Sequence, residues 1–488
     1  MATELLKELP APVLRVGGDK LAAGSGGYHR HINPYDGTFQ GDVPLAGREE
    51  VDQAVEAALA VADEWRSWRP EQRREVLLRH AELIRNHREE FGRLGALDNG
   101  MPITMGRGSA DLAAEWTAYY AGWCDKIDGD LLATYGTRNS FSYTAPEPYG
   151  VIGVILTWNG PLVSLGMSVP APLAAGNCVV VKPSELTPFS AELYADLADQ
   201  AGIPAGVISV LPGGAEAGDA LVRHPRVDKI SFVGGPTTAR KILAACAESF
   251  TPSVMELGGK SAGLVFPDCD DLDAVAQRAA FSAFGKMSGQ ACAVPTRLVI
   301  HEDLHDELVA KVCDAARAYT MGDPLSDDVQ MGPVINAAAQ RRILAMIDQA
   351  VSDGAGQVVQ GGNAPAGQLG GKNFVEPTVL IVTDPSHEIA QTEVFGPVLL
   401  VFRFTDEDEA IKLANDTDYG LAAYIESNDL QRVHRVAERL RAGGVYVNGA
   451  TTINPYTPYG GLGLSGYGKQ GGRVGIDEFV RYKTVSIA

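Results

Sequence analysis

The sequence predicts an α/β protein with two open parallel-sheet domains and a small additional sheet. The chain has 488 residues, more than the roughly 250–300 at which a single hydrophobic core stops growing. From residue 149 onward, short runs rich in Val and Ile alternate with stretches of helical periodicity, and they do so in two successive series. Strands that alternate with helices at this pitch indicate parallel sheets covered by helices.

The first part of the chain, up to about residue 130, is predicted to be mostly helical after an irregular start. Residues 51–65 and 71–97 have apolar residues at helical spacing and charged opposite faces. The first alternating series follows residue 149. We expect its strands at 151–156, 178–181, 207–211 and 230–233, and its helices at 162–175, 190–201, 215–222 and 237–249.

A second series follows Glu256. The glycine-rich segments 354–371 and 459–475 are predicted to be loops, because they have neither the periodicity of a helix nor that of a strand. We expect the strands of this series at 262–266, 297–301, 398–404 and 444–447, and its helices at 272–284, 304–319, 338–351 and 430–440.

Two further segments have the alternation of strands but no obvious local partner. They are residues 137–146 and 479–487. An unpaired edge strand is a liability unless another segment or another chain covers it. We therefore predict that residues 131–148 and 472–488 form a small sheet that bridges the subunits of a homodimer or homotetramer.

Composition excludes several classes of function. Acidic residues outnumber basic ones by 61 to 41, giving a net charge of −20. The negative electrostatic field of such a protein repels the phosphates of nucleic acids, so no nucleic-acid partner is expected. No basic segment followed by an apolar core begins the sequence, and no apolar run reaches the ~18 residues of a membrane span. The six cysteines are scattered, which predicts a cytoplasmic protein without disulfides or a metal site.

The most informative chemistry surrounds Cys292, which ends the run Phe-Gly-Lys-Met-Ser-Gly-Gln-Ala-Cys. Upstream, the run Met-Glu-Leu-Gly-Gly-Lys places Glu256 just before a pair of glycines. A thiol nucleophile and a carboxylate base are the two groups that acyl chemistry through a thioester requires. None of the nine histidines lies in a motif, which makes a Cys–His or Ser–His dyad a poor alternative.

These motifs resemble those of the NAD(P)-dependent aldehyde dehydrogenase superfamily, and the resemblance extends from about residue 33 to residue 484. It implies that residues 1–130 and 149–256 form a Rossmann-like NAD-binding domain and that 257–450 form a catalytic domain. The other matching motifs are Thr-Trp-Asn-Gly-Pro at 157–161, Lys-Pro-Ser-Glu at 182–185, Glu-Val-Phe-Gly-Pro at 393–397, Pro-Tyr-Gly-Gly at 458–461 and Ser-Gly at 465–466.

The resemblance further implies a hydrolytic, non-acylating enzyme that converts an aldehyde and water to a free carboxylic acid. Cys292 would attack the aldehyde and pass through a thiohemiacetal and a thioester. Asn159 and the backbone N–H of Cys292 would stabilise the oxyanion, and Glu256 would activate the hydrolytic water. Asn159 can also be interpreted as a cap of the following helix.

The cofactor implied is NAD, with NADP less favoured, because a carboxylate at Glu185 would repel a 2′-phosphate. The chain departs from the family at 234–239, where Gly-Gly-Pro-Thr-Thr-Ala replaces the usual Gly-Ser-Thr-x-x-Gly. Proline in the first helical turn and glycine before it still allow a phosphate to approach the helix. The residues expected at the cofactor are Lys182, Glu185, Trp158, Gly234, Gly235, Leu257, Gly258, Glu393 and Phe395.

Positions that match the family's aldehyde tunnel predict a roomy apolar passage for a medium-to-large apolar aldehyde. Several hold small side chains, and none is an arginine that could bind a second carboxylate. Two alternatives remain: a CoA-acylating dehydrogenase, a class that generally lacks the glutamate base, and a non-catalytic nucleotide-binding relative. The tunnel positions are Gly160, Ser164, Met167, Ala291, Ala293, Ile453 and Tyr459.

Overall fold

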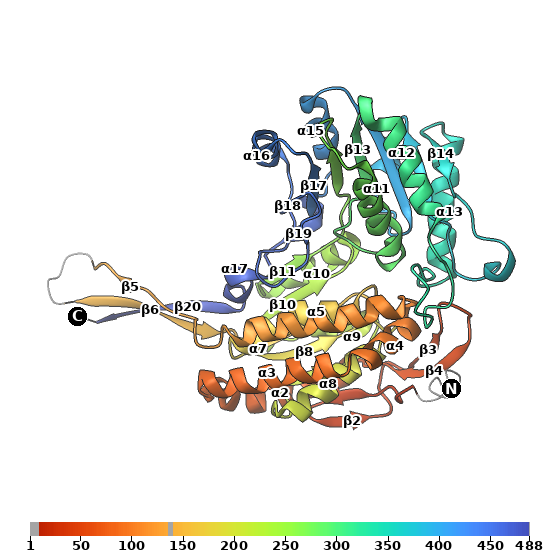
Figure 1. The fold of residues 1–488 in the computed structure, drawn as a ribbon. Helices are drawn as coiled ribbons and strands as arrows, with labels where there is room; N and C mark the ends of the chain where they lie inside the picture. Colours follow the sequence, from red (N-terminus) through yellow and green to blue (C-terminus); the bar gives the residue numbers. More distant parts are fainter. Residues whose placement is uncertain (1–8, 135–139, 488) are drawn as a thin grey trace.

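The computed structural model describes residues 9–134 and 140–487. An eight-stranded and a seven-stranded sheet each form the centre of a domain, and a three-stranded sheet projects to one side as an arm (Figure 1). The predicted α/β fold, with two parallel-sheet domains and a small extra sheet, is confirmed.

The first sheet has the strand order β19-β11-β10-β7-β8-β9-β1-β2 and is parallel from β11 to β9. Its central strands are continuous apolar runs buried along their length, as expected of a parallel sheet with both faces covered. The parallel strands are β7 (Val151–Ile155), β8 (Cys178–Lys182), β9 (Ile208–Val210), β10 (Lys229–Val233) and β11 (Ser253–Glu256), and the antiparallel edges are β1 (Leu14–Val16), β2 (Asp19–Leu21) and β19 (Gly466–Tyr467).

Helices cover both faces of this sheet (Figure 1). A hairpin of β3 (Tyr28–Ile32) and β4 (Phe39–Pro44) lies beside it. The helices are α2 (Arg48–Ser67), α3 (Pro70–Asn86), α4 (Arg88–Asn99), α5 (Ile103–Ala121), α6 (Pro161–Ser168), α7 (Pro170–Ala174), α8 (Phe189–Ala201), α9 (Ala215–Arg223) and α10 (Pro236–Ser249).

The second sheet has the strand order β14-β15-β16-β13-β12-β17-β18, and only the pairing of β14 with β15 is antiparallel. Alternate residues of β16 enter two separate apolar clusters, one on each face of the sheet. The strands are β12 (Ala262–Val265), β13 (Arg297–His301), β14 (Gly356–Gln360), β15 (Thr378–Val382), β16 (Val398–Phe404), β17 (Ala422–Glu426) and β18 (Gly444–Val447), and the helices are α11 (Leu272–Ala280), α12 (Glu302–Arg317), α13 (Ala337–Ser352), α14 (Glu388–Gln391), α15 (Glu407–Asn415) and α16 (Leu430–Arg439).

Several predicted boundaries were wrong. The helix predicted at 71–97 is interrupted at His87, whose ring hydrogen-bonds to the Leu83 carbonyl. The helix predicted at 162–175 is divided before Pro170, which has no backbone N–H to continue the ladder. The segment 354–371 is not all loop, because it contains β14. Likewise, the segment 459–475 contains β19, and α17 (Gly472–Asp477) begins there.

The arm joins the two segments that lacked a local partner in the sequence. Strand β20 (Val480–Ile487) pairs antiparallel with β6 (Phe141–Pro148) along its whole length, and β5 (Leu131–Leu132) pairs with β6 on the other side. Residues 137–139 of the predicted strand lie outside the described residues. The arm exposes large apolar side chains, among them Leu131, Phe141 and Ile487. The segment predicted for this sheet at 472–488 was too long, because residues 472–477 form a helix. A subunit-bridging role for the sheet stays a prediction.

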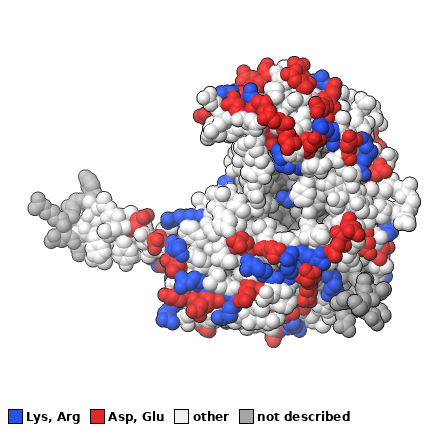
Figure 2. Space-filling view, viewed as in Figure 1, with Lys and Arg blue, Asp and Glu red and all other residues white. Residues whose placement is uncertain are grey.

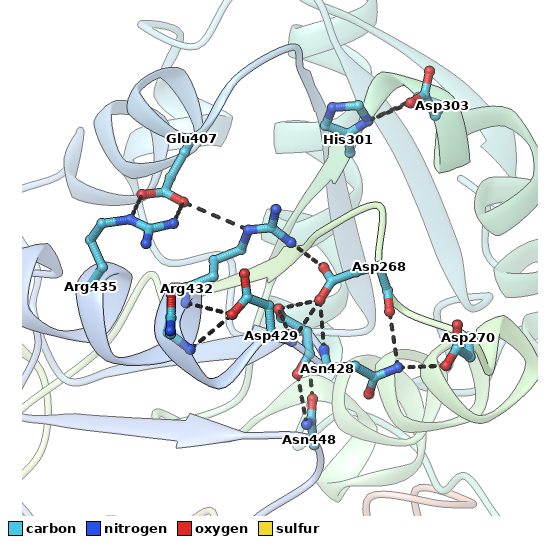
Figure 3. Close-up of polar contacts among 12 residues, drawn as sticks. Asp268, Asp270, His301, Asp303, Glu407, Asn428, Asp429, Arg432, Arg435 and Asn448 are labelled. Carbon is cyan, nitrogen blue, oxygen red and sulfur yellow. Dashed lines mark hydrogen bonds and ion pairs between the residues drawn. The ribbon is translucent and has the colours of Figure 1, made fainter.

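A polar cluster centred on Asp268 fastens two loops of the second domain together (Figure 3). The carboxylate accepts hydrogen bonds from the Ser427 hydroxyl at 2.8 Å, from the backbone N–H of Asn428 at 2.9 Å and from that of Asp429 at 2.7 Å. Arg432 also donates to it. Burial favours the neutral acid, but these donors and the arginine charge outweigh it and hold the pKa of Asp268 below its usual value.

Replacing Asp268 with alanine is expected to lower the free energy of unfolding by about 2 kcal/mol, because several donors lose a charged acceptor at once. Urea denaturation followed by fluorescence measures the change. Asp270→Ala is the matched control, since that carboxylate accepts one bond, from the Asn428 amide at 2.8 Å. An equal decrease in the free energy of unfolding of the two variants would contradict the conclusion that Asp268 joins the two loops.

Candidate active site

The candidate site is a cleft where the carboxyl edge of the first sheet faces the segments that enter the second sheet. Asn159 follows β7, Glu256 ends β11, Cys292 precedes β13, and Glu393 precedes β16. The cavity has a volume of about 250 Å³, and the surface is hollowed between the two domains (Figure 2). Ligands of open α/β sheets bind at this edge of the strands.

Most of the residues expected at the site line this one cleft. The three residues expected to be catalytic are among them. Lys182 and Glu185 are the exceptions, because they lie at the end of the neighbouring strand β8 and do not reach the cavity wall. The other residues brought together are Gly160, Ser164, Met167, Ala291, Ala293, Ile453 and Tyr459 of the expected tunnel and Trp158, Gly234, Gly235, Leu257, Gly258, Glu393 and Phe395 of the expected cofactor site.

Asn159 is held in place through both its backbone and its side chain. Its Nδ2 donates to the carbonyl of Gln290 at 2.8 Å, and the Asn99 amide donates to the Asn159 carbonyl at 2.8 Å. An amide nitrogen has two N–H groups, so the bond to Gln290 leaves one of them for another acceptor. The residue is 9% exposed, and a buried, preoriented donor of this kind suits a developing oxyanion.

The loop before Cys292 has an unusual backbone. Met287, Ser288 and Gly289 have φ values of 53°, 54° and 72°. These values lie in the left-handed region, which residues other than glycine rarely adopt. Gln290 secures the turn, because Nε2 donates to the Met287 carbonyl at 3.1 Å and Oε1 accepts from the Ile335 N–H at 3.0 Å. Strained backbone of this kind is concentrated at functional sites.

The Cys292 thiol is half-buried and faces several charged groups. Burial raises the pKa of Cys292 to about 11; the nearby carboxylates of Glu393 and Glu256 add to this, and the Lys286 ammonium opposes it. A hydrogen bond with the Tyr459 hydroxyl at 3.4 Å also lowers the thiol pKa. The thiolate is the nucleophilic form, so these neighbours decide how reactive the residue is.

Glu256 is a buried carboxylate without a hydrogen-bond partner for either oxygen within residues 9–134 and 140–487. Burial raises the pKa of Glu256 well above its ordinary value, Glu478 adds to the shift and Lys469 opposes it. A carboxylate with free lone pairs and an elevated pKa is a stronger proton acceptor than an ordinary carboxylate.

A second carboxylate, Glu393, lies close to the backbone of the loop after β11. It accepts a hydrogen bond from the Gly259 N–H at 3.0 Å, and a Cβ at Gly258 would stand 2.3 Å from its Oε2, so a larger residue there would displace this carboxylate. Burial raises the pKa of Glu393 to about 7. Nearby, Phe395 has a φ of 52° and packs edge-on against Trp158, with 5.4 Å between ring centroids.

The residues expected to hold a dinucleotide fit that role at two places. At the N-terminus of α10, no side chain caps the helix, and the position of a Cβ at Gly235 meets nothing within 4 Å, so the free N–H groups can be approached by a phosphate. Lys182 donates to the carbonyls of Pro183 at 3.0 Å and Gly213 at 2.6 Å. Burial lowers its pKa to about 8, against the effect of Glu185.

Sequence reasoning missed some of the lining. Lys286 and Met287 stand inside the motif before Cys292, yet neither was assigned a role. The Met287 sulfur lies 3.6 Å from the position that a Cβ on Gly160 would occupy, so Met287 fills space that the glycine leaves open. Gln470 lies on a distant loop with no motif, and only the fold brings it here. The other unassigned lining residues are Thr157, Val163, Val233 and Val294.

Neither a cluster of metal ligands nor a membrane-spanning helix occurs within residues 9–134 and 140–487. No cluster of His, Cys, Asp and Glu side chains there has the arrangement of a metal site. No helix among them is both long and apolar enough to cross a bilayer.

Comparisons with known proteins identify relatives over nearly the whole chain. The family model for the aldehyde dehydrogenase family matches residues 22–485. The chain is 38% identical over 463 residues to an aldehyde dehydrogenase of Enchytraeus buchholzi, covering 93% of this chain and 91% of that protein. It is 34% identical to PnpE of Pseudomonas sp. WBC-3, solved in complex with nicotinamide adenine dinucleotide, with a TM-score of 0.95 and 98% of each chain covered. A Bacillus cereus aldehyde dehydrogenase in complex with NAD+ has 32% identity and a TM-score of 0.94, covering 100% of this chain and 98% of that one.

Proposed function

The chain belongs to the aldehyde dehydrogenase family and is an oxidoreductase, and from this premise we propose that it oxidises an aldehyde to the free carboxylic acid with NAD. The observation that carries the proposal is the meeting of Cys292, Asn159 and Glu256 in one cleft, although they come from three separate segments of the chain. A nucleophile, an oxyanion donor and a base are the three groups that the reaction requires.

The first half of the reaction forms a bond to sulfur. Cys292 loses its proton and attacks the aldehyde carbonyl, and the negative charge moves to the carbonyl oxygen. The free N–H of Asn159 and the backbone N–H of Cys292 stabilise this oxyanion. Nicotinamide supplies the hydride acceptor when the cofactor is bound, and Cys292 then holds the acyl group as a thioester.

The second half of the reaction releases the acid. Glu256 takes a proton from water, the resulting hydroxide adds to the thioester carbonyl, and the C–S bond breaks to return the electron pair to sulfur. The unpaired oxygens of Glu256 support this role, since no protein donor in the described ranges competes for the proton-accepting lone pairs. A CoA-acylating enzyme would have no need of this base.

NAD is favoured over NADP because Glu185 places a carboxylate after β8, where it would repel a 2′-phosphate. Lys182 beside it would hold the ribose, the N-terminus of α10 would face the pyrophosphate, and Glu393 would bind the nicotinamide ribose. PnpE and the Bacillus cereus enzyme, both solved with this dinucleotide, support the choice.

The substrate we propose is a medium-to-large apolar aldehyde. The wall of the cleft is mainly apolar, with Val163, Met167 and Ile453 on it, and the small residues Gly160 and Ala293 leave room. We further propose that the protein works in the cytoplasm as a homodimer or homotetramer joined through the arm, whose exposed apolar side chains would then be covered.

A chain-length series of aldehydes, assayed by NADH absorbance with NAD and with NADP, tests this function. We expect catalytic efficiency to increase from acetaldehyde to medium-length and aromatic aldehydes, because each buried CH₂ contributes about 0.8 kcal/mol, and to be higher with NAD. Product analysis with and without CoA should give the free acid in both cases. An optimum at acetaldehyde, or at a semialdehyde with a carboxylate, would contradict the proposed substrate.

A further inference from the structure

The Tyr459 hydroxyl is the polar group that touches the nucleophile. Its oxygen lies 3.4 Å from the Cys292 sulfur, although the two residues are 167 positions apart in the chain. The ring is only 4% exposed. Within residues 9–134 and 140–487 no other hydrogen-bond partner of this hydroxyl occurs. Its capacity for hydrogen bonding is therefore directed at the thiol.

The backbone fixes the position of this ring. The Tyr459 N–H donates to the Gln470 carbonyl at 2.6 Å, and the Gln470 N–H donates back to the Tyr459 carbonyl at 2.8 Å. The Gln470 side chain donates in turn to the Ser168 hydroxyl at 3.0 Å. A side chain anchored in this way loses little conformational entropy when it forms its hydrogen bond. This is the condition for a preorganised site.

The direction of the hydrogen bond follows from the two acidities. Burial, together with the neighbouring Cys292 and Glu256, raises the pKa of Tyr459 well above its ordinary value. A thiol is ordinarily more acidic than a phenol, and this shift is in the direction that keeps the proton on the phenol when the thiol loses its own. Once sulfur is an anion it can only accept, so the Tyr459 O–H must donate to it.

The other charges around the sulfur make this donor important. Glu393 and Glu256 both oppose a negative charge on Cys292, and Lys286 is the cation that favours it. Burial, the largest of the effects on this thiol, disfavours the thiolate further. A hydrogen bond to an ion is stronger than one between neutral groups, and the Tyr459 hydroxyl is placed to supply it.

We propose that Tyr459, besides lining the cleft, is a catalytic hydrogen-bond donor to the Cys292 thiolate. The thiol proton leaves to solvent, and the phenol stabilises the sulfur lone pair. When the C–S bond forms, that pair enters the bond and the hydrogen bond weakens. When the thioester C–S bond breaks, the pair returns to sulfur and the phenol donates again. Its part in turnover depends on the proposed aldehyde oxidation, but its effect on the free thiol does not.

The test is the pH dependence of Cys292 alkylation by iodoacetamide, without aldehyde or nucleotide, with the Cys292 peptide quantified by mass spectrometry. Tyr459→Phe removes one oxygen and keeps the ring. We expect the apparent thiol pKa to rise by about one unit, with alkylation about tenfold slower at neutral pH. Tyr446→Phe is the matched control, because Tyr446 packs on Tyr424 with 5.5 Å between centroids and its hydroxyl does not touch the sulfur; its profile should equal that of the parent.

Thermal unfolding first establishes that the variants fold. If Tyr459→Phe does not fold, 3-fluorotyrosine at position 459 gives the opposite prediction, since a more acidic phenol donates more strongly and should lower the thiol pKa. An unchanged alkylation profile overturns the proposal, and so does a lower rate that levels off at the same pH as in the parent. Failure of aldehyde turnover with a shifted alkylation profile would count against the proposed function alone.

Discussion

Replacing Cys292 with alanine is expected to reduce aldehyde turnover by at least about 10⁴-fold, because the variant has no nucleophile to form the thiohemiacetal. The loss should appear in kcat and not in nucleotide binding, since the sulfur is not among the groups expected to hold the dinucleotide. Stopped-flow NADH absorbance and fluorescence titration with NAD measure the two quantities.

A matched control for this variant is Cys246→Ala. Cys246 is also a free cysteine, but it is buried on α10 away from the cleft lining, so its removal should leave turnover within about twofold of the parent. Turnover that survives in Cys292→Ala, or is lost equally in Cys246→Ala, would contradict the role of Cys292.

Replacing Glu256 with glutamine should block the second half of the reaction and spare the first. We expect one rapid equivalent of NADH per active site, followed by a steady rate that is about 10²–10⁴-fold slower, because glutamine cannot accept the proton of water. Glu216→Gln is the control, since Glu216 is an exposed acidic residue in the first turn of α9.

The pH dependence of this step follows from the environment of Glu256. Burial raises its pKa, so the ionised base becomes more abundant as the pH increases from weakly acidic toward that raised pKa. Hydrolysis in the parent should therefore accelerate with pH over this range, and the acceleration should be absent in Glu256→Gln. A steady-state rate limited by another step would hide the trend, so the deacylation step is measured after the burst. The same pH slope in both proteins would contradict the assignment of the base.

The sequence alone predicted the two alternating series because each strand there is a continuous apolar run bounded by turn residues. It did not predict β1 to β4, β11, β14, β15 or β17. For example, β14 lies in a glycine-rich segment and is not separated from its surroundings by periodicity. The return of β19 to the first sheet, where Gly466 pairs with Glu256, depends on a contact between distant parts of the chain. Local patterns cannot report such contacts.

In the candidate site, too, the residues in local motifs were predicted from the sequence and the contacts between distant residues were not. Cys292, Glu256 and Asn159 were found because each stands in a recognisable motif. The bond of Asn159 to the Gln290 carbonyl joins residues 131 positions apart, and the contact of Tyr459 with sulfur is also long-range. Lys286 lies six positions before Cys292 in the same motif, but nothing in the sequence alone indicated that its side chain lines the cleft.

The central claim is that Cys292 holds the acyl group as a thioester that Glu256 then hydrolyses. Intact-protein mass spectrometry of Glu256→Gln, quenched in acid after mixing with a medium-length aldehyde and NAD, tests it most directly. We predict a mass increase equal to the acyl group on nearly every chain, located by peptide mapping on Cys292 and absent from the Cys292→Ala variant. Full NADH release with no adduct on Cys292, or an adduct on another residue, would contradict the account.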